Sequence, residues 1–222
     1  MRMCINIGYA SEIYEIDPQD LIILPDCPPQ HASAVKKNAP ITVLLGNRDE
    51  NRPDSLVCGR QAVTEALATG KAYIPVQFCF ISKIPAWNLL PVFIKKFRYK
   101  YKYFNTHIYH LSARRLREQK LERGIRTAEN AYAITNKRWA IPENERIQKY
   151  QKLVASLQNG FDDAYPLSIM LCRRGGVKDC LDNGHHRMGI CLDLGIDRIS
   201  TNFIAAGKSP LILQWLYKLL HK

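Results

Sequence analysis

The amino-acid sequence predicts a mixed α/β (α+β) protein made of two tandem modules followed by a C-terminal helix. Short apolar segments typical of β-strands alternate with segments whose apolar residues recur at helical spacing. The chain has 222 residues, of which 46% are hydrophobic, so it has room for one large core or two small ones. A faint internal repeat favours two modules over one.

The repeat relates the first half of the chain to the second. Residues 13–21 resemble residues 108–116, and residues 40–45 resemble residues 166–171. Four more positions match at a constant offset of 125, namely Gly59, Gly70, Ile74 and Phe78 with Gly184, Gly195, Ile199 and Phe203. A period this long indicates duplicated domains rather than a solenoid. We therefore expect a first module over residues 1–85, a basic aromatic linker or edge strand over 86–104, a second module over 105–206 and an amphipathic helix over 207–222.

The elements of the second module follow from its sequence patterns. Glu143 to Asn159 has apolar residues at helical spacing and is followed by Gly160, which predicts a helix that ends there. A short helix is expected after an Asn-Gly turn and before Gly195. Residues 177–181 are the predicted strand before that turn. The first module has a predicted strand at 73–81 but no counterpart to the long helix, because prolines interrupt residues 25–39.

The run Asp182 to Arg187, Asp-Asn-Gly-His-His-Arg, is the strongest functional signal. Gly184 allows a sharp turn into a helix start, where N–H groups without intrahelical partners favour anions. His185, His186 and Arg187 add side-chain donors for phosphate oxygens on the same turn. We therefore predict that Gly184 to Arg187 bind a phosphate or nucleotide; a purely structural turn is the alternative.

At these residues the chain resembles the ParB/sulfiredoxin superfamily, whose members carry a Gly-x-x-Arg or Asp-Gly-His-His-Arg turn between a strand and a helix. The resemblance covers residues 105–206 and implies further strands at 108–111, 166–171 and 199–204. The Gly-His-His-Arg motif is similar to that of the free-serine kinases in this superfamily. It implies two ParB/sulfiredoxin-like modules, of which the first is degenerate, because Gly59-Arg60-Gln61-Ala62 stands in place of the motif. His185 occupies the position of the cysteine that sulfiredoxin chemistry requires, so that chemistry is not expected.

The resemblance implies a magnesium-dependent phosphotransferase, similar to a small-molecule kinase, or a nucleotide hydrolase. Relatives place an acidic general base near the long helix, and Glu143 and Glu145 both fit that position. A favourable interaction with the helix dipole explains two acids in a first turn equally well. Asp182 is a candidate Mg²⁺ ligand, although many relatives have their aspartate at the position of Asn183. The candidate catalytic residues are Glu143, Glu145, Asp182, His185 and His186.

The nucleotide and the function class stay open at this point. ATP, ADP and CTP are equally compatible with the motif, and nothing identifies the phosphate acceptor. The main alternative to catalysis is a ParB-like DNA-associated regulatory or partition protein, which binds nucleotide or DNA phosphate without metabolic chemistry. A nuclease is a third possibility, but the sequence shows no cluster of metal ligands for it.

The net charge of +12 is concentrated between residues 95 and 120. Within this stretch, residues 97–104 alternate basic and aromatic side chains, which would place them on opposite faces of a strand. The simplest interpretation is an edge strand that its lysines protect against aggregation. Binding of DNA or another polyanion through residues 95–120 is a second interpretation, and contact with an anionic membrane or glycolipid is a third.

The remaining features predict a cytoplasmic protein. The seven cysteines include no CxxC pair, which is typical of buried thiols in a reducing compartment. The N-terminus has no apolar core of a secretory signal. Residues 72–94 are apolar, but three prolines interrupt them, so we expect a strand and linker and no transmembrane segment. The apolar stripe after Ser209-Pro210 is expected to pack on the protein itself or on a second subunit of a homodimer.

Overall fold

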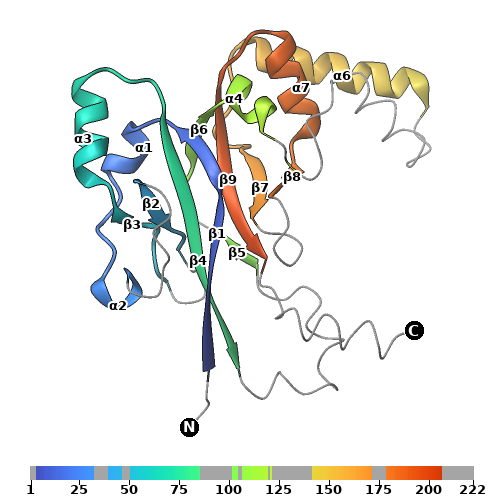
Figure 1. The fold of residues 1–222 in the computed structure, drawn as a ribbon. Coiled ribbons are helices and arrows are strands. Elements are labelled where there is room, and N and C mark those ends of the chain that lie inside the picture. The colour runs from blue at the N-terminus through green and yellow to red at the C-terminus, as the bar shows by residue number, and fades with distance from the viewer. Residues whose placement is uncertain are drawn as a thin grey trace.

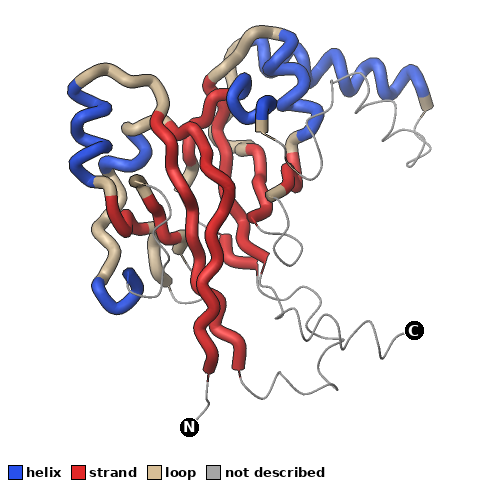
Figure 2. The backbone as a smooth tube through the Cα atoms, in the orientation of Figure 1, coloured by secondary structure: helices blue, strands red, loops and turns tan. Residues whose placement is uncertain are grey.

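The computed structural model describes residues 4–32, 40–46, 51–85, 102–104, 107–119, 121, 142–171 and 179–206. Within these residues the chain forms one mixed sheet of nine strands with six helices (Figures 1 and 2). The predicted mixed α/β class is therefore confirmed. The helices α1 and α3 lie beside one half of the sheet, and α4, α6 and α7 lie beside the other (Figure 1).

The first half of the chain contains four strands and three helices in the described residues. Tyr14 and Ile16 are fully buried, whereas Ile13, which precedes Tyr14, is 48% exposed, as expected for successive side chains of a strand. Val63 and Ala66 lie three residues apart on one helix and both are buried in the core. The elements are β1 (Cys4–Ile16), α1 (Gln19–Ile22), α2 (Pro29–Ala32), β2 (Thr42–Leu44), β3 (Ser55–Cys58), α3 (Arg60–Ala68) and β4 (Ile74–Pro85).

The second half contains the remaining elements, including the long predicted helix. That helix runs over Glu143–Gln158, which confirms the prediction from helical spacing. Its packing against the core comes from Tyr150, Leu153, Val154 and Leu157. The elements are β5 (Lys102–Phe104), β6 (Tyr109–Ser112), α4 (Ala113–Glu118), α6 (Glu143–Gln158), β7 (Leu167–Leu171), β8 (Cys180–Asn183), α7 (His185–Asp193) and β9 (Arg198–Ala206).

The strand connectivity of the first half recurs in the second. The sheet order is β3-β2-β4-β1-β6-β9-β7-β8, so the order of the first half reappears in reverse beyond the β1–β6 junction; β5 pairs with β9 outside this path. The β1–β4 and β6–β9 pairs are antiparallel, the β2–β4 and β7–β9 pairs are parallel, and the β2–β3 and β7–β8 pairs are antiparallel. The register shifts at matching places, between Thr42 and Val43 in β2 and between Ser168 and Ile169 in β7.

An aromatic cluster fills the core where the two halves meet. β1 pairs antiparallel with β6 at Ile16 and Leu111. The rings of Phe78 and Phe203 stack with their centroids 4.0 Å apart. Tyr14 contacts Phe203 at a centroid distance of 5.0 Å, and Tyr109 contacts Phe78 at 4.9 Å. Each half therefore contributes one tyrosine and one phenylalanine to a shared core.

Reciprocal hydrogen bonds cross the same junction. The Tyr14 hydroxyl donates to Asp179 Oδ2 at 2.7 Å, and the Tyr109 hydroxyl donates to Asp54 Oδ2 at 2.7 Å. All four residues are buried, with the two aspartates only 2% and 1% exposed. Because buried carboxylates need donors, each tyrosine ties its own half of the chain to the other half.

Some predicted element boundaries differ from the structure. The strand predicted at 177–181 lies at Cys180–Asn183, because Asn183 pairs with Ser168 of β7 and only Gly184 remains for the turn. The strand predicted at 73–81 continues to Pro85 along β1. Of the basic aromatic stretch, Lys102–Phe104 form β5 and pair with β9, whereas residues 95–101 lie outside the described residues.

The C-terminal helix predicted over 207–222 also lies outside the described residues. The same holds for Cys172 and for the side chain of Cys4. Over the described ranges, no helix has both the length and the apolar character that crossing a membrane requires. The free thiols of Cys79, Cys180 and Cys191 are buried, as predicted, whereas those of Cys27 and Cys58 are only half-buried.

Candidate phosphate-binding site at the start of α7

The predicted Gly-His-His-Arg run folds into a strand-to-helix turn. β8 ends at Asn183, Gly184 is the N-cap residue and α7 begins at His185. Gly184 has φ of 95°, a left-handed conformation that favours glycine. Its N-cap position has no side-chain hydrogen bond to the helix. The first turn of α7 therefore keeps the polarity that favours an anion at a helix N-terminus.

The guanidinium of Arg187 lies beside this turn. A Cβ atom added to Gly184 would lie 3.4 Å from Arg187 Nη2, so the side chain folds back toward the helix start. Nη2 donates to the Pro166 carbonyl at 3.3 Å, and the guanidinium carbon lies 5.7 Å from the centre of the Phe161 ring. Nη1 is buried and has no hydrogen-bond partner among the described residues.

Burial also affects the ionisation of Arg187 and its neighbour on the next turn. Burial of the guanidinium lowers the pKa of Arg187 from its ordinary value. The pKa of the Cys191 thiol is raised to about 11, mainly by burial and against the opposing effect of Arg187. Cys191 is therefore a protonated thiol at neutral pH and supplies no thiolate to this site.

The other predicted residues of the run lie close to Arg187 in the chain. His185 and His186 are the first two residues of α7, and both are half-buried. Asp182 belongs to β8 and is half-buried, whereas Asn183 is exposed. Over the described ranges, no group of three or more His, Cys, Asp or Glu side chains is arranged to hold a metal ion. Asp182 therefore stays a single candidate ligand for Mg²⁺.

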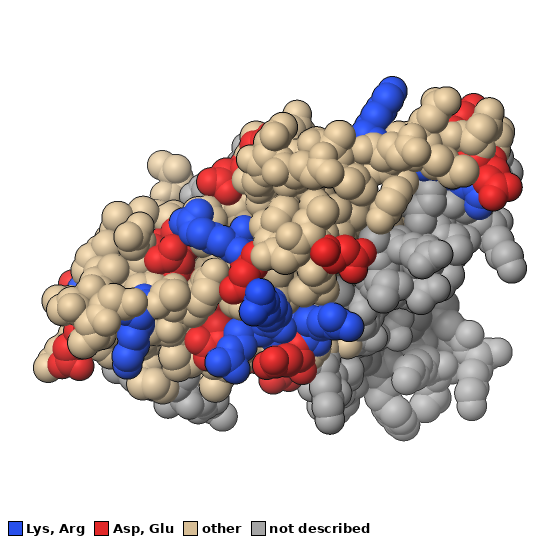
Figure 3. Space-filling model, turned by 90° about the horizontal axis from the view of Figure 1, so that it is seen from above, with Lys and Arg blue, Asp and Glu red and all other residues tan. Residues whose placement is uncertain are grey.

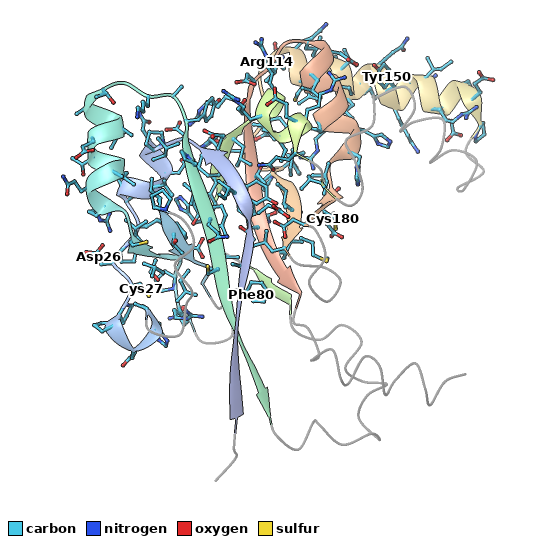
Figure 4. The ribbon with its side chains drawn as sticks, in the orientation of Figure 1. Asp26, Cys27, Phe80, Arg114, Tyr150 and Cys180 are labelled. Atoms are coloured by element: carbon cyan, nitrogen blue, oxygen red, sulfur yellow. The ribbon has the colours of Figure 1, made fainter. Side chains whose placement is uncertain are left out.

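The structure does not bring Glu143 and Glu145 to this turn. Both lie in the first turn of α6 and are exposed. That end of α6 projects away from the sheet, whereas α7 begins next to β8 (Figure 1). The midpoint of α6 carries Tyr150, and the helix reaches the core only from there to its C-terminal end (Figure 4). An acidic position near a helix end cannot be located in space from sequence spacing alone.

The matching turn of the first half is built differently. Gly59 has φ of 99° and precedes α3, as Gly184 precedes α7. Arg60 donates to the carbonyl oxygens of Ile22 at 3.0 Å and of Leu24 at 2.6 Å. It also forms an ion pair with Asp26 at 2.6 Å (Asp26 is labelled in Figure 4). Its guanidinium is therefore occupied by the chain itself. At the position of Arg187 the first half has Ala62.

A second polar cluster was not predicted from the sequence. His110 Nδ1 lies 3.0 Å from Asp20 Oδ1, and His110 Nε2 lies 3.3 Å from Asp163. The side chains of His110 and Asp20 are 13% and 10% exposed, and that of Asp163 is 58% exposed. In the sequence, Asp163 lies between Phe161 and Pro166, both of which contact Arg187. No local sequence signal joins these three positions, because they come from α1, β6 and the segment after α6.

Comparisons with known proteins do not assign the chain to a family: no protein-family model, no curated protein and no solved structure matches it.

Proposed function

We propose that the chain binds the phosphate of a nucleotide at the start of α7 and uses it in phosphoryl transfer or hydrolysis. The ligands are the Gly184 turn, His185, His186 and Arg187. The nucleotide is ATP, ADP or CTP, with Mg²⁺ as the counter-ion that such chemistry generally needs.

The observation that carries this proposal is the state of Arg187. A guanidinium has five N–H donors and no acceptor, and burial without partners has a free-energy cost. Arg187 makes one long hydrogen bond, and its buried Nη1 has no partner in the described chain. A phosphate at the adjacent helix start would accept from Nη1 and from the backbone N–H groups together.

A duplication supports the choice of the second half as the binding half. The two halves share strand order, pairing directions, register shifts and glycine-capped helices. We therefore propose that they are two ParB/sulfiredoxin-like modules. The first has lost both histidines of the motif, and its Arg60 is bonded to Asp26 and to the chain's own carbonyls, so the second module is the functional one.

Within this proposal, each candidate has a chemical role. Arg187 neutralises phosphate charge, while His185 or His186 donates a hydrogen bond to the phosphoryl group that is transferred. Asp182 is a Mg²⁺ ligand on the adjacent strand. Glu143 and Glu145 remain candidate general bases for the acceptor, but only if α6 or the acceptor brings them near α7.

The proposal is tested by thermal unfolding of the full chain with ATP, ADP and CTP, each with and without Mg²⁺. A ligand that binds only the folded protein raises stability by about 2.7 kcal/mol at one hundred times its dissociation constant. We expect one nucleotide to produce such a shift and Arg187→Met to weaken its binding at least about tenfold. The absence of any shift with every nucleotide would refute the proposal.

The matched control is Arg115→Met. Arg115 is an exposed arginine of α4 that forms an ion pair with Glu118 at 3.7 Å, so this variant removes the same charge from a side chain outside the Gly184–Arg187 turn. It should leave nucleotide binding unchanged. Equal losses in both variants would mean that binding follows overall charge, which favours the DNA-associated or polyanion-binding alternative.

A further inference from the structure

A pocket lies where the two halves of the chain meet. This pocket, of about 300 Å³, is lined by the turn between β1 and α1, by the loop between α3 and β4, and by the first residue of β9. The loops that line it are at the end of the molecule seen from above in Figure 3, where Lys and Arg side chains lie among Asp and Glu side chains. It shares no lining residue with the Gly184–Arg187 turn.

The position of the pocket follows from the repeated connectivity. Tyr73 precedes Ile74 at the start of β4, and Arg198 precedes Ile199 in β9, so the two residues are separated by the same 125 positions as their strands. Both line the pocket. Equivalent positions of the two halves thus converge on one cavity but carry different side chains, a phenol and a guanidinium.

Among the described residues, Asp17 is the only carboxylate that lines the pocket, and it is already engaged by the protein. Asp17 Oδ1 accepts the Gln19 backbone N–H at 2.9 Å. Asp17 Oδ2 accepts from Arg198 Nη2 at 3.3 Å, and the Asp17 side chain is only 15% exposed. Asp17 therefore holds Arg198 in place and has little capacity left for a cationic ligand.

Hydrogen-bond donors, in contrast, remain available. The Arg198 side chain is 53% exposed, and its two weak bonds to Asp17 leave other N–H groups of the guanidinium unused. Lys71 is exposed and has no ion pair within the described chain. The hydroxyl of Tyr73 likewise has no hydrogen bond to the described residues. Burial and the nearby Asp197 raise the pKa of Tyr73, so this phenol keeps its proton and can donate.

We propose that this pocket binds a small organic carboxylate. Its carboxylate is held by Arg198 and Lys71, with Tyr73 as a third donor, and its carbon chain lies against Leu67 and Ala72. The planar fork of an arginine matches the two oxygens of a carboxylate. The volume is at the lower end of the range for small-molecule sites, which suits a metabolite of a few carbons rather than a nucleotide.

The ligand class predicts a particular order of affinities. Succinate should bind more tightly than butyrate, because its second carboxylate gives Lys71 and Arg198 one partner each. Glycine and butylamine should gain nothing from their ammonium groups, because Asp17 is occupied by Arg198 and Gln19. Inorganic phosphate tests whether the site recognises any anion or a carboxylate in particular.

The experiment is titration calorimetry of the full chain with these probes at constant ionic strength. Wild-type protein should bind succinate, and Lys71→Met and Arg198→Met should each weaken that binding at least about tenfold. Tyr73→Phe should weaken it by a smaller factor, because a neutral donor contributes less than a charged one. Arg115→Met is the matched control and should bind as the wild type does.

Lys71→Met is the decisive variant because Lys71 makes no ion pair in the described chain, so its loss should not disturb folding. Arg198→Met also removes the bond to Asp17, and its melting temperature must be compared with that of the wild type. Failure of succinate to bind, or equal binding by wild type and Lys71→Met, would overturn the proposal. Tighter binding of phosphate or butylamine than of succinate would overturn the ligand class. None of these outcomes depends on nucleotide binding at α7.

Discussion

Arg60 and Arg187 follow glycines in matching turns, but the rest of the chain surrounds them differently. Arg60 donates to two backbone carbonyls and forms an ion pair with Asp26, which ties α3 to the segment after α1. Arg187 has one hydrogen bond, to Pro166, and a buried Nη1 without a partner in the described chain. A side chain that the fold needs should affect stability, and one that a ligand needs should not.

We therefore predict opposite effects of the two substitutions on stability. Arg60→Met should lower the free energy of unfolding by about 1–3 kcal/mol, because hydrogen bonds of a charged group are lost and the carbonyls of Ile22 and Leu24 lose a donor. Arg187→Met should change it by less than about 1 kcal/mol, because the removed guanidinium is incompletely bonded. Urea unfolding of both variants measures the difference. A larger loss for Arg187→Met would identify that arginine as a structural residue.

At this scale, the sequence predicts the position of Arg187 but not its surroundings. The Gly-His-His-Arg run is local, so its place at a helix start could be predicted. The Phe161 ring and the Pro166 carbonyl come from the segment after α6, and only tertiary folding brings them to Arg187. The same holds for the contacts of His110 with Asp20 and Asp163, which span 90 and 53 positions of sequence.

The glycines at the two ends of α7 make different demands on the backbone. Gly184 and Gly195 both have positive φ, at 95° and 71°. A Cβ atom at Gly184 would overlap the Leu167 side chain, whereas a Cβ atom at Gly195 would meet nothing within 4 Å. The start of α7 is therefore fitted closely against β7, and its end faces open space.

We predict that Gly184→Ala is much more destabilising than Gly195→Ala. A non-glycine residue in the left-handed region costs about 1–2 kcal/mol, and both variants incur this cost. Gly184→Ala should cost a further 1–3 kcal/mol, roughly what overpacking a core costs, because Leu167 must move. Chemical unfolding of the two variants gives the comparison. Similar losses at both positions would show that the β7–α7 contact is loose and that the turn is not held rigidly for a ligand.

Elements with regular periodicity were predicted well, and their edges less well. The 16-residue helix α6 follows directly from its apolar spacing and from the glycine after it. β8 begins later than its apolar residues suggest and includes Asp182 and Asn183, because pairing with β7 continues through Asn183. Strand pairing is set by a partner about 15 residues earlier in the chain, and residue type alone does not report it.

At the scale of the whole molecule, the two halves share one core through the tyrosine–aspartate pairs. This arrangement makes stability depend on pH at the alkaline end. Burial and Asp54 raise the pKa of Tyr109 well above its ordinary value. Above about pH 10 a tyrosine of the unfolded chain loses its proton while Tyr109 of the folded chain keeps it. The unfolded state then binds fewer protons, so stability falls as the pH rises.

We expect the free energy of unfolding to decrease above about pH 10, with Tyr109 contributing up to about 1.4 kcal/mol per pH unit. Tyr109→Phe should reduce this slope, since phenylalanine has no proton to lose. Tyr165→Phe is the control, because Tyr165 is 69% exposed. Urea unfolding at a series of pH values between 8 and 11 measures the slope. An unchanged slope in Tyr109→Phe would show that the phenol ionises as easily when folded.

The reciprocal tyrosines give the last prediction, which concerns how the two halves unfold. Tyr14→Phe leaves Asp179 with the Glu12 N–H as a donor, and Tyr109→Phe leaves Asp54 with the Gly46 N–H. Because each change removes one 2.7 Å bond to a buried carboxylate, each should lower stability by a similar amount, about 1–3 kcal/mol.

Unfolding should remain one cooperative transition in both variants, since the stacked Phe78 and Phe203 still join the halves. Calorimetry and denaturant unfolding with two probes test this together. Two separate transitions in the wild type, or a silent substitution at one tyrosine only, would show that the halves are not held together by equivalent contacts.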